Sequence, residues 1–366
     1  LNLLSKYFLI VLISGLISTI SVPFVIKLGS KYKVLDVPNN RKKHSIPIVR
    51  IGGLSIVISI IISLLMAYFL NWLDIPNDSF IYLLLPTSFL VFLLGLFDDI
   101  YTISPFLRLI FQIIISSFVW AQGIRIDLLD LTWFNNDFYF YLPNTLSLIV
   151  TVFWISAIIN AFNWLDGLDG LAAGTCVVSA FGFSLICFSI NQESDSYLLA
   201  AFIGSCIGFL NYNFYKAKIY MGDCGSYFIG FCLSIIAIHT SYSEETLIQG
   251  SKLAEFILPF LFLMLPISDM IFVIFKRIYS KKSPFLADRN HFHHRLINAG
   301  FNHKNSVLFS YAINQLFVGI ALAIHFEKYI FPILITSIFI FFSFLFKECD
   351  VNIKRNLRIT IKSKIK

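Results

Sequence analysis

Long apolar runs recur along the whole chain and restrict its fold more than any other feature. A helix needs about 20 apolar residues to cross a bilayer. Only 13% of the residues are charged, against about 25% in an ordinary globular domain. The sequence therefore predicts an all-α polytopic membrane protein, a bundle of about 10–11 transmembrane helices. The expected spans lie near residues 7–29, 51–73, 79–97, 104–122, 144–161, 170–190, 196–214, 225–242, 254–275, 307–325 and 329–346.

The spans form one predicted domain, residues 1–346, followed by a basic tail, residues 347–366. The first apolar run is long and lacks a small-residue cleavage site, so it is expected to stay in the membrane. The six cysteines form no CxxC pair and most fall inside apolar runs. We therefore expect packing residues, with neither a zinc site nor disulfides.

Lysine and arginine are divided very unequally between alternate loops. Of the 28 basic residues, only Lys6, Arg125, Lys252 and Lys328 fall outside one set of loops and the tail. The positive-inside rule places that set in the cytoplasm, with the N-terminus outside and the C-terminus inside. Anionic lipid then explains the net charge of +7, and no nucleic-acid partner is expected. The basic set comprises 27–50, 98–108, 215–223, 276–306 and 347–366.

Clusters of polar residues fall on this same predicted side. The first of them, "NAFNWLDGLDG", lies between two apolar runs. If it continues as a helix, Asn160, Asn163, Asp166 and Asp169 recur at intervals of three and form one polar ridge. Glycines beside the ridge would let a helix or a ligand approach. A capped helix end in water is the simpler alternative. The other clusters are "DVPNNRKKHSIPIVRIGG" (36–53), "GLFDDI" (95–100), "YMGDCGS" (220–226) and "SPFLADRNHFHHRL" (283–296).

Aspartates in these clusters indicate a cation site. Asp98 and Asp99 are adjacent and repel one another unless a cation or a proton lies between them. Asp223 lies between two glycines that permit a tight turn. Oxygen donors without thiolates favour magnesium over zinc. Magnesium binds one or two carboxylates together with substrate phosphates, so we do not expect every aspartate to be a ligand.

The basic clusters are suited to phosphate. His291, His293 and His294 with Arg295 could bind zinc, but no cysteine accompanies them and the HxxxH spacing is absent. Charge-assisted hydrogen bonds to phosphate are the better explanation. The same function is expected of the nearby Arg289 and of Arg41, His44 and Arg50, although a plain positive-inside loop also explains those charges.

In this order, the motifs resemble those of the polyprenyl-phosphate N-acetylhexosamine-1-phosphate transferases of glycosyltransferase family 4. The resemblance covers nearly the whole chain and includes "DD", "MGDCGS", "PISD" and "DRNHFHHRL". It implies transfer of a UDP-activated N-acetylhexosamine-1-phosphate, with N-acetylglucosamine favoured by the HxHH form, to undecaprenyl phosphate, releasing UMP. It also implies a bacterial inner-membrane protein whose active-site groove opens to the cytoplasm. The expected partners are the two substrates, membrane lipid and, as one possibility, a second copy in a homodimer.

The resemblance also assigns residue roles. It links Asp223 to Mg²⁺, for which Mn²⁺ can substitute, and Asp98 and Asp99 to metal handling and acceptor activation. Asp269 is added because it is an ionisable residue inside a span. The predicted catalytic residues are Asp98, Asp99, Asp166, Asp169, His291, His293 and His294; the predicted substrate-binding residues are Arg41, His44, Arg50, Asn160, Asn163, Asp269, Arg289 and Arg295; the predicted metal ligands are Asp223, Asp98 and Asp99.

Several alternatives stay open at this point. A secondary transporter would place its polar residues near the bilayer midplane and show an internal repeat, but the acids here cluster at span ends. An intramembrane aspartyl protease would need a mate for Asp269 inside a span, and none is evident. Asp98 or Asp99 could act as a base or as a nucleophile that forms a phospho-enzyme. The same chemistry with another UDP-sugar, and the glycan pathway, also stay open.

Overall fold

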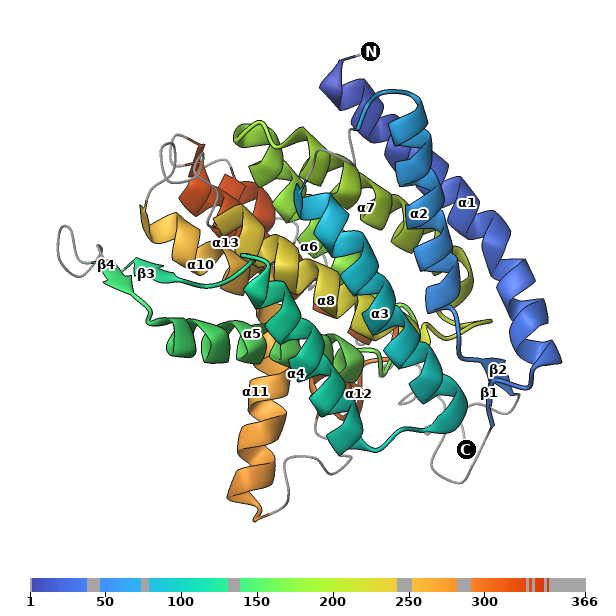
Figure 1. The fold of residues 1–366 in the computed structure, drawn as a ribbon. Helices are drawn as coiled ribbons and strands as arrows, with labels where there is room; N and C mark the ends of the chain where they lie inside the picture. The colour runs from blue at the N-terminus through green and yellow to red at the C-terminus, as the bar shows by residue number, and fades with distance from the viewer. Residues whose placement is uncertain are drawn as a thin grey trace.

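The computed structural model describes residues 2–37, 47–73, 79–130, 139–241, 252–281, 291–326, 329–330, 333–338 and 341. These residues form a helical bundle with two short antiparallel hairpins, β1–β2 and β3–β4 (Figure 1). The helices are α1 (Leu3–Lys31), α2 (Gly53–Phe69), α3 (Ser79–Tyr101), α4 (Pro105–Ala121), α5 (Asn144–Leu165), α6 (Leu171–Ser189), α7 (Glu193–Asn213), α8 (Gly222–Ser241), α10 (Lys252–Phe262), α11 (Met264–Tyr279), α12 (Phe292–Asn298) and α13 (His303–His325). The strands are β1 (Leu35–Asp36), β2 (Ile48–Val49), β3 (Leu128–Asp130) and β4 (Tyr139–Tyr141).

The predicted class, an all-α polytopic membrane protein, is confirmed. In the described part of the chain six helices are long and apolar enough to cross a membrane, namely α1, α3, α5, α6, α8 and α13. Helices α2 and α4 are apolar but have 17 residues each. The expected span 254–275 is two helices, α10 and α11, which divide at Leu263. Most of the expected span 329–346 lies outside the described residues.

Helix α8 lies at the centre of the bundle. Its apolar window is 94% buried, and α2, α3, α5, α6 and α10 pack around it. Helix α1 lies at the edge, where only 28% of its window is buried. Its outward-facing Leu12, Leu16 and Ile20 are 61–62% exposed. Such a stripe fits hydrocarbon better than water, because lipid tails are as apolar as leucine.

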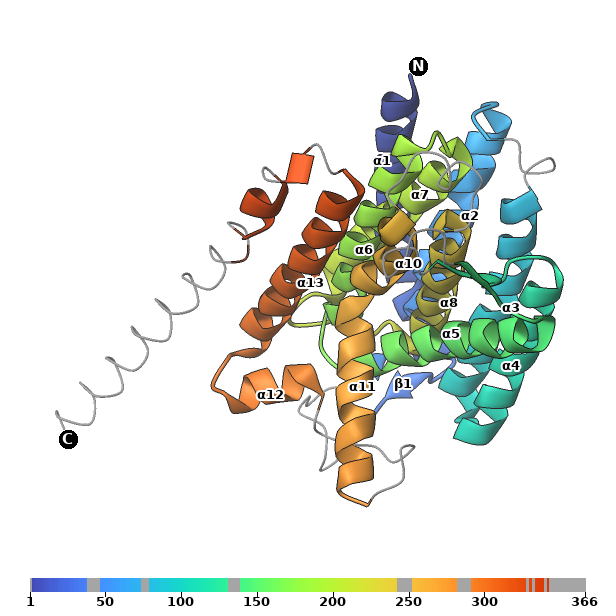
Figure 2. The same cartoon turned by 90° about the vertical axis from the view of Figure 1, so that its left-hand side faces the viewer.

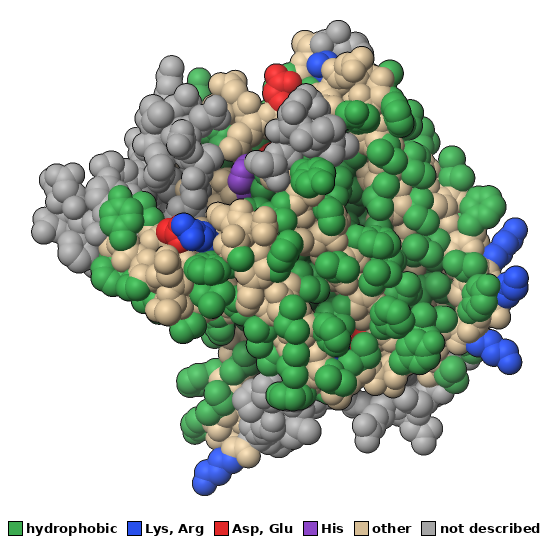
Figure 3. Space-filling model, viewed as in Figure 1, with side chains coloured by type: hydrophobic (Ala, Val, Ile, Leu, Met, Phe, Trp, Pro, Cys, Tyr) green, Lys and Arg blue, Asp and Glu red, His purple; other side chains and the backbone are tan. Residues whose placement is uncertain are grey.

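The surface supports the same conclusion. Figure 3 shows hydrophobic side chains over most of one face, with most of the lysine and arginine near its edges. On α4 the large side chains Phe106, Ile114 and Phe118 are 50–72% exposed. A soluble monomer rarely exposes a continuous apolar patch of more than a few hundred square ångströms. The outer faces of the bundle are therefore suited to lipid.

Local sequence signals set several helix starts. Ser104 caps α4, because its Oγ accepts from the Leu107 amide at 3.3 Å, and Pro105 follows at the first helical position. Asn302 caps α13 in the same way through the Asn305 amide. Both starts lie at the end of the bundle where α3 and α5 end and α6 and α8 begin (Figures 1 and 2). We call this the motif end.

A small backbone lattice completes the motif end. Val49 pairs in parallel with Ile219, and the Tyr220 amide donates to the Val49 carbonyl at 2.8 Å. The Gly52 amide donates to the Tyr220 carbonyl at 2.9 Å. These bonds fix the segment before α2 against the segment before α8, so Arg50 is held beside the first turn of α8.

Candidate active site

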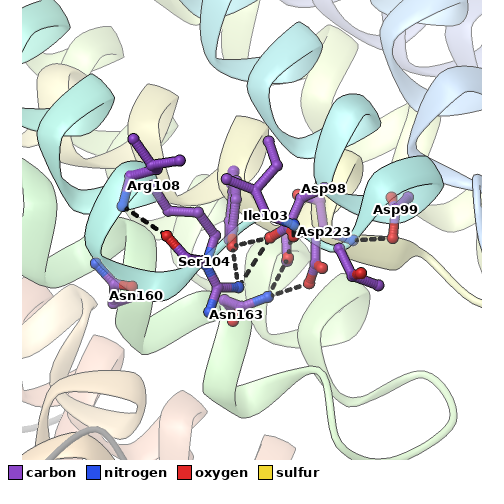
Figure 4. A network of polar contacts seen from close by, with 12 residues as sticks. Asp98, Asp99, Ile103, Ser104, Arg108, Asn160, Asn163 and Asp223 are labelled. Carbon is purple, nitrogen blue, oxygen red and sulfur yellow. Dashed lines mark hydrogen bonds and ion pairs between the residues drawn. The ribbon is translucent and has the colours of Figure 1, made fainter.

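The two adjacent aspartates near the end of α3 have different partners. Asp98 Oδ2 accepts from Arg108 Nη1 at 2.8 Å and from the Tyr227 hydroxyl at 2.9 Å. Its Oδ1 accepts from the Ile103 amide at 2.9 Å. The Asp98 side chain is 4% exposed. The expected cation between the aspartates is thus, at Asp98, a guanidinium on α4 (Figure 4).

Asp99 points to the start of α8 instead. Its Oδ1 and Oδ2 accept from the backbone amides of Asp223 and Cys224, each at 3.0 Å. Its Oδ1 also accepts from Arg50 Nε at 3.0 Å, and the side chain is fully buried. A helix N-terminus leaves its first amides without intrahelical partners and favours a negative charge. Asp99 therefore caps α8 from a neighbouring helix.

Asp223 occupies the first turn of α8. Asn163 Nδ2, in the last turn of α5, donates to Asp223 Oδ1 at 2.6 Å (Figure 4). Arg50 Nη2 donates to Asp223 Oδ2 at 3.2 Å. The Asp223 side chain is 20% exposed, unlike that of Asp99. Helix α3 approaches this turn closely, because a Cβ on Gly95 would lie 2.5 Å from the Asp223 carbonyl oxygen.

Asp166 is the acid of this cluster whose charge lacks a direct counterpart. Within the described residues no hydrogen bond or ion pair engages its half-buried carboxylate. Burial first, and then the charges of Asp223, Asp99 and Asp169, raise the pKa of Asp166 well above its ordinary value. A nearby cation would reverse this shift.

The donor set decides which acids fit magnesium. Asp98 and Asp99 spend their oxygens on protein donors, so the geometry does not favour them as ligands. Asp223 accepts from Asn163 and Arg50 but keeps a side chain that is 20% exposed, and the half-buried carboxylate of Asp166 has no donor among the described residues. Two carboxylates suffice where substrate phosphates complete the shell. The described residues contain no group of three or more His, Cys, Asp or Glu side chains arranged for a metal. By the chemistry of their donor atoms, Asp223 and Asp166 are the acids that could hold a magnesium ion shared with substrate.

The expected helical ridge from Asn160 to Asp169 is wrong. Helix α5 ends at Leu165 with Asp166 at its C-cap, and Gly170 has a φ of +83° before α6 begins. Asn160 Nδ2 donates to Gln112 Oε1 on α4 at 2.8 Å, away from the ridge. Asp169 Oδ2 accepts from the Ala217 amide at 3.0 Å and so holds the segment before α8. The glycines of this segment therefore favour the end of α5 over a continuous helix.

Asp269 supports the histidine cluster. His291 Nδ1 donates to Asp269 Oδ2 at 2.9 Å, and the Phe292 amide donates to Asp269 Oδ1 at 2.5 Å. The His291 and His293 rings are stacked in parallel, with centroids 5.6 Å apart. Asp269 is thus the residue on α11 that fixes the start of α12.

His293 behaves differently from a phosphate-binding cation. It is 2% exposed and packs on Gly167, where a Cβ would lie 2.7 Å from its ring. Burial first, and then His294 and His291, lower the pKa of His293 to about 3. It is therefore neutral near pH 7. His294 contacts its ring at a centroid distance of 4.4 Å.

Of the remaining predicted substrate-binding residues, one lies within the described part of the chain and three lie outside it. Arg295 is exposed, and its guanidinium lies 3.8 Å from the ring centroid of Phe272, so it ties α12 to α11. Arg41, His44 and Arg289 lie outside the described residues.

Sequence reasoning missed several residues around the site. Arg108 and Tyr227 are partners of Asp98, and Trp164 and Arg277 lie beside the histidines. Arg108 had a usable signal, since it is the lone charge in the apolar stretch 104–121 and ionisable residues in such stretches are seldom idle. Tyr227 and Trp164 had none, because aromatic residues are common throughout this chain.

The fold and site define a polytopic membrane protein with an acidic cluster and a histidine cluster at one end of its bundle. The model of "Glycosyl transferase family 4" matches residues 80–241, which contain Asp98, Asp99 and Asp223. The chain belongs to this family. A Bacillus subtilis (strain 168) protein is 32% identical over 310 residues, which cover 85% of this chain and 82% of the relative. It is named "Probable undecaprenyl-phosphate N-acetylglucosaminyl 1-phosphate transferase".

Two further relatives have related names. The "Decaprenyl-phosphate N-acetylglucosaminephosphotransferase" of Mycobacterium leprae (strain TN) is 28% identical over 85% of this chain and 81% of its own length. The "Undecaprenyl-phosphate alpha-N-acetylglucosaminyl 1-phosphate transferase" of Escherichia coli (strain K12) is 26% identical over 91% of this chain and 88% of its own. The matches extend across both the acidic and the membrane-spanning parts of the chain.

Proposed function

We propose that this protein transfers N-acetylglucosamine-1-phosphate from UDP-N-acetylglucosamine to undecaprenyl phosphate, releasing UMP. This would be the initiating step of a cell-surface glycan. The observation that carries the proposal is the convergence of Asp98, Asp99, Asn163 and Asp223 at one end of a membrane bundle. The relatives' names supply undecaprenyl phosphate and the N-acetylglucosaminyl 1-phosphate group, and the family resemblance suggests the UDP donor.

The substrates themselves require a site at a membrane face. One is a lipid phosphate and the other is a soluble nucleotide sugar, so both reach the protein only at the bilayer surface. The motif end meets this requirement, because the acids lie at helix ends. We propose that it faces the cytoplasm of the bacterial inner membrane, since most basic residues belong to its loops.

Magnesium is the proposed cofactor, with Asp223 and Asp166 as the residues that would hold it. When bound, it would neutralise charge on the donor's diphosphate. The chain's own residues position Asp223. Asn163 and Arg50 orient Asp223, and Asp99 fixes the helix turn that carries it. Phosphoryl transfer depends mainly on such positioning.

The proposed reaction is a direct displacement. An oxygen of undecaprenyl phosphate forms a bond to the phosphorus that carries the sugar, and the bond from that phosphorus to the UMP oxygen breaks. A phosphate monoester has a second pKa of about 6, so the acceptor needs little help in losing its proton near neutral pH. A phospho-enzyme would require Asp98 or Asp99 to leave three protein donors each. Their burial argues against that route.

The histidine cluster is proposed to face the donor. His291 is held by Asp269 through Nδ1, which leaves Nε2 as its other polar atom. His293 is neutral and packed on Gly167, so its proposed function is to support the neighbouring ring. We therefore propose that the cation near the diphosphate is an arginine rather than a protonated histidine.

The test is an assay of purified protein with undecaprenyl phosphate and a panel of UDP-sugars. We expect UMP release and a lipid diphosphate product with UDP-N-acetylglucosamine, in a reaction that EDTA stops and Mg²⁺ restores. Product with another UDP-sugar alone would change the sugar and keep the chemistry. No lipid product with any UDP-sugar would reject the enzyme and leave the transporter as the alternative.

A further inference from the structure

The last turn of α5 touches both halves of the candidate site. Asn163 donates to Asp223 in the acidic half at 2.6 Å. The next residue, Trp164, contacts the other half, where its ring centroid lies 5.9 Å from that of His291 at an angle of 75°. Adjacent residues on a helix project about 100° apart. One turn can therefore serve two clusters.

Trp164 also carries a cation. The guanidinium carbon of Arg277, in the last turn of α11, lies 4.7 Å from the Trp164 ring centroid. Arg277 is 4% exposed, so its charge is held in a largely water-free position. Tryptophan is the strongest of the aromatic partners for such a cation, and the attraction grows as the pair is desolvated. Arginine suits it because its planar group stacks on a ring.

We propose that Trp164 is a positioning residue for the donor's diphosphate, which acts by holding Arg277 and His291 in register with the Asn163–Asp223 pair. The inference rests on the proposed function. Asp269 fixes His291 from one side through its Nδ1 at 2.9 Å. Trp164 fixes the ring edge-to-face from another side, a favoured aromatic geometry.

The consequence is a mechanical link between elements far apart in sequence. The acidic half belongs to α3, α5 and α8, whereas the histidines and Arg277 belong to α11 and α12. In the described residues the α5 end also meets the histidines at Gly167, which packs on His293. Helix α5 also packs directly against α11, and there Trp164 contributes the contact to Arg277. Both halves must be correctly spaced because one nucleotide sugar has to span them.

The first test separates the ring from its bulk. Trp164→Phe keeps an aromatic face under Arg277, whereas Trp164→Leu removes it and keeps an apolar side chain. We expect Trp164→Leu to raise the KM for UDP-N-acetylglucosamine roughly 30-fold, the size of one desolvated cation–π contact. The KM for undecaprenyl phosphate should stay unchanged, and Trp164→Phe should recover most of the loss. Trp72→Phe, three residues after the end of α2, is the matched control.

A second test uses coupling. Arg277→Gln should also raise the KM for the nucleotide sugar, and the double variant Trp164→Leu/Arg277→Gln should be no worse than the poorer single variant. Independent contributions would multiply instead. A multiplied loss, or a loss confined to kcat, would overturn the positioning role.

A third test does not need turnover. The emission of Trp164 is the difference between the wild-type spectrum and that of Trp164→Phe. Added UMP, whose phosphate would occupy part of the proposed diphosphate site, should change this difference while leaving the emission of the Trp164→Phe variant constant. If wild-type protein is active but UMP changes both spectra equally, and Trp164→Leu keeps a normal KM, the inference fails alone. An inactive wild type whose Trp164 emission ignores UMP would reject the proposed function as well.

Discussion

Gly95→Ala is the smallest change that should move Asp98 and Asp99 on α3 away from Asp223 on α8. A Cβ at this position would lie 2.5 Å from the Asp223 carbonyl oxygen and from the Cys224 Cα. These are backbone atoms, so no side chain can rotate away. An ordinary contact begins near 3.4 Å, which means that the first turn of α8 must move by about 1 Å relative to α3.

The size of the effect follows from this displacement. A misplacement of about 1 Å can cost about 100-fold in rate, so we expect kcat/KM to fall about 100-fold. Overpacking costs about 1–3 kcal/mol, and the better helix propensity of alanine returns up to about 1 kcal/mol. The variant should therefore fold, with a net loss of about 3 kcal/mol or less.

The assay is UMP release from UDP-N-acetylglucosamine with undecaprenyl phosphate, together with thermal unfolding in detergent. Gly15→Ala is the matched control, because it is also a mid-helix glycine but its nearest neighbour atom would lie 3.3 Å away, against α7. We expect the control to keep near-normal activity. A Gly95→Ala protein that folds and retains kcat/KM within about threefold would refute the argument that the α3–α8 spacing sets Asp223.

Three further predictions follow from the site. Asp223→Ala should abolish turnover while the protein still inserts and folds, and EDTA should do the same to the wild type; unimpaired turnover in either would reject the metal assignment. His293 has a folded pKa of about 3 against an ordinary 6.5, so its contribution to stability is complete above pH 6.5 and falls as the pH drops towards 3. The free energy of unfolding should therefore fall less between pH 6.5 and pH 3 in His293→Gln than in the wild type. An equal fall in both proteins would contradict the prediction. In a Cys349→Ser background the described cysteines are buried, so Asn302→Cys should react with impermeant reagents only from the cytoplasm and Gln122→Cys only from outside, and the reverse pattern would invert the proposed orientation.

Much of the fold was predictable because bilayer crossing imposes a simple length rule. The expected spans 7–29, 144–161 and 170–190 lie within α1, α5 and, to within a residue at each end, α6. The break at Leu263 was not predicted. The run there stays apolar through Pro259 and Pro266, and hydropathy alone does not reveal a division between two helices.

The residues of the site were largely predictable from the sequence, whereas the contacts between them were less so. The sequence brought Asp99, Asn163 and Asp223 to one face, and the structure joins them. It did not reveal that Asp99 caps α8 or that Arg108 pairs with Asp98, because pairings between helices come from tertiary packing. The false ridge had a local cause. The repeat "LDGLDG" has helical spacing, but glycine also ends helices.

The charge balance of the acidic cluster connects these contacts to the proposed chemistry. Asp98 is neutralised by Arg108, and Asp99 and Asp223 share Arg50, which leaves Asp166 without an internal cation among the described residues. Four carboxylates facing two guanidiniums are formally negative, and both proposed substrates are anions that such a cluster would repel. A divalent cation at Asp166 and Asp223 would remove this repulsion. Arg108 is bound to Asp98, and Arg50 lies closer to Asp99, at 3.0 Å, than to Asp223, at 3.2 Å. The proposed cation would therefore bind Asp166 with Asp223, where the substrate phosphates could share it.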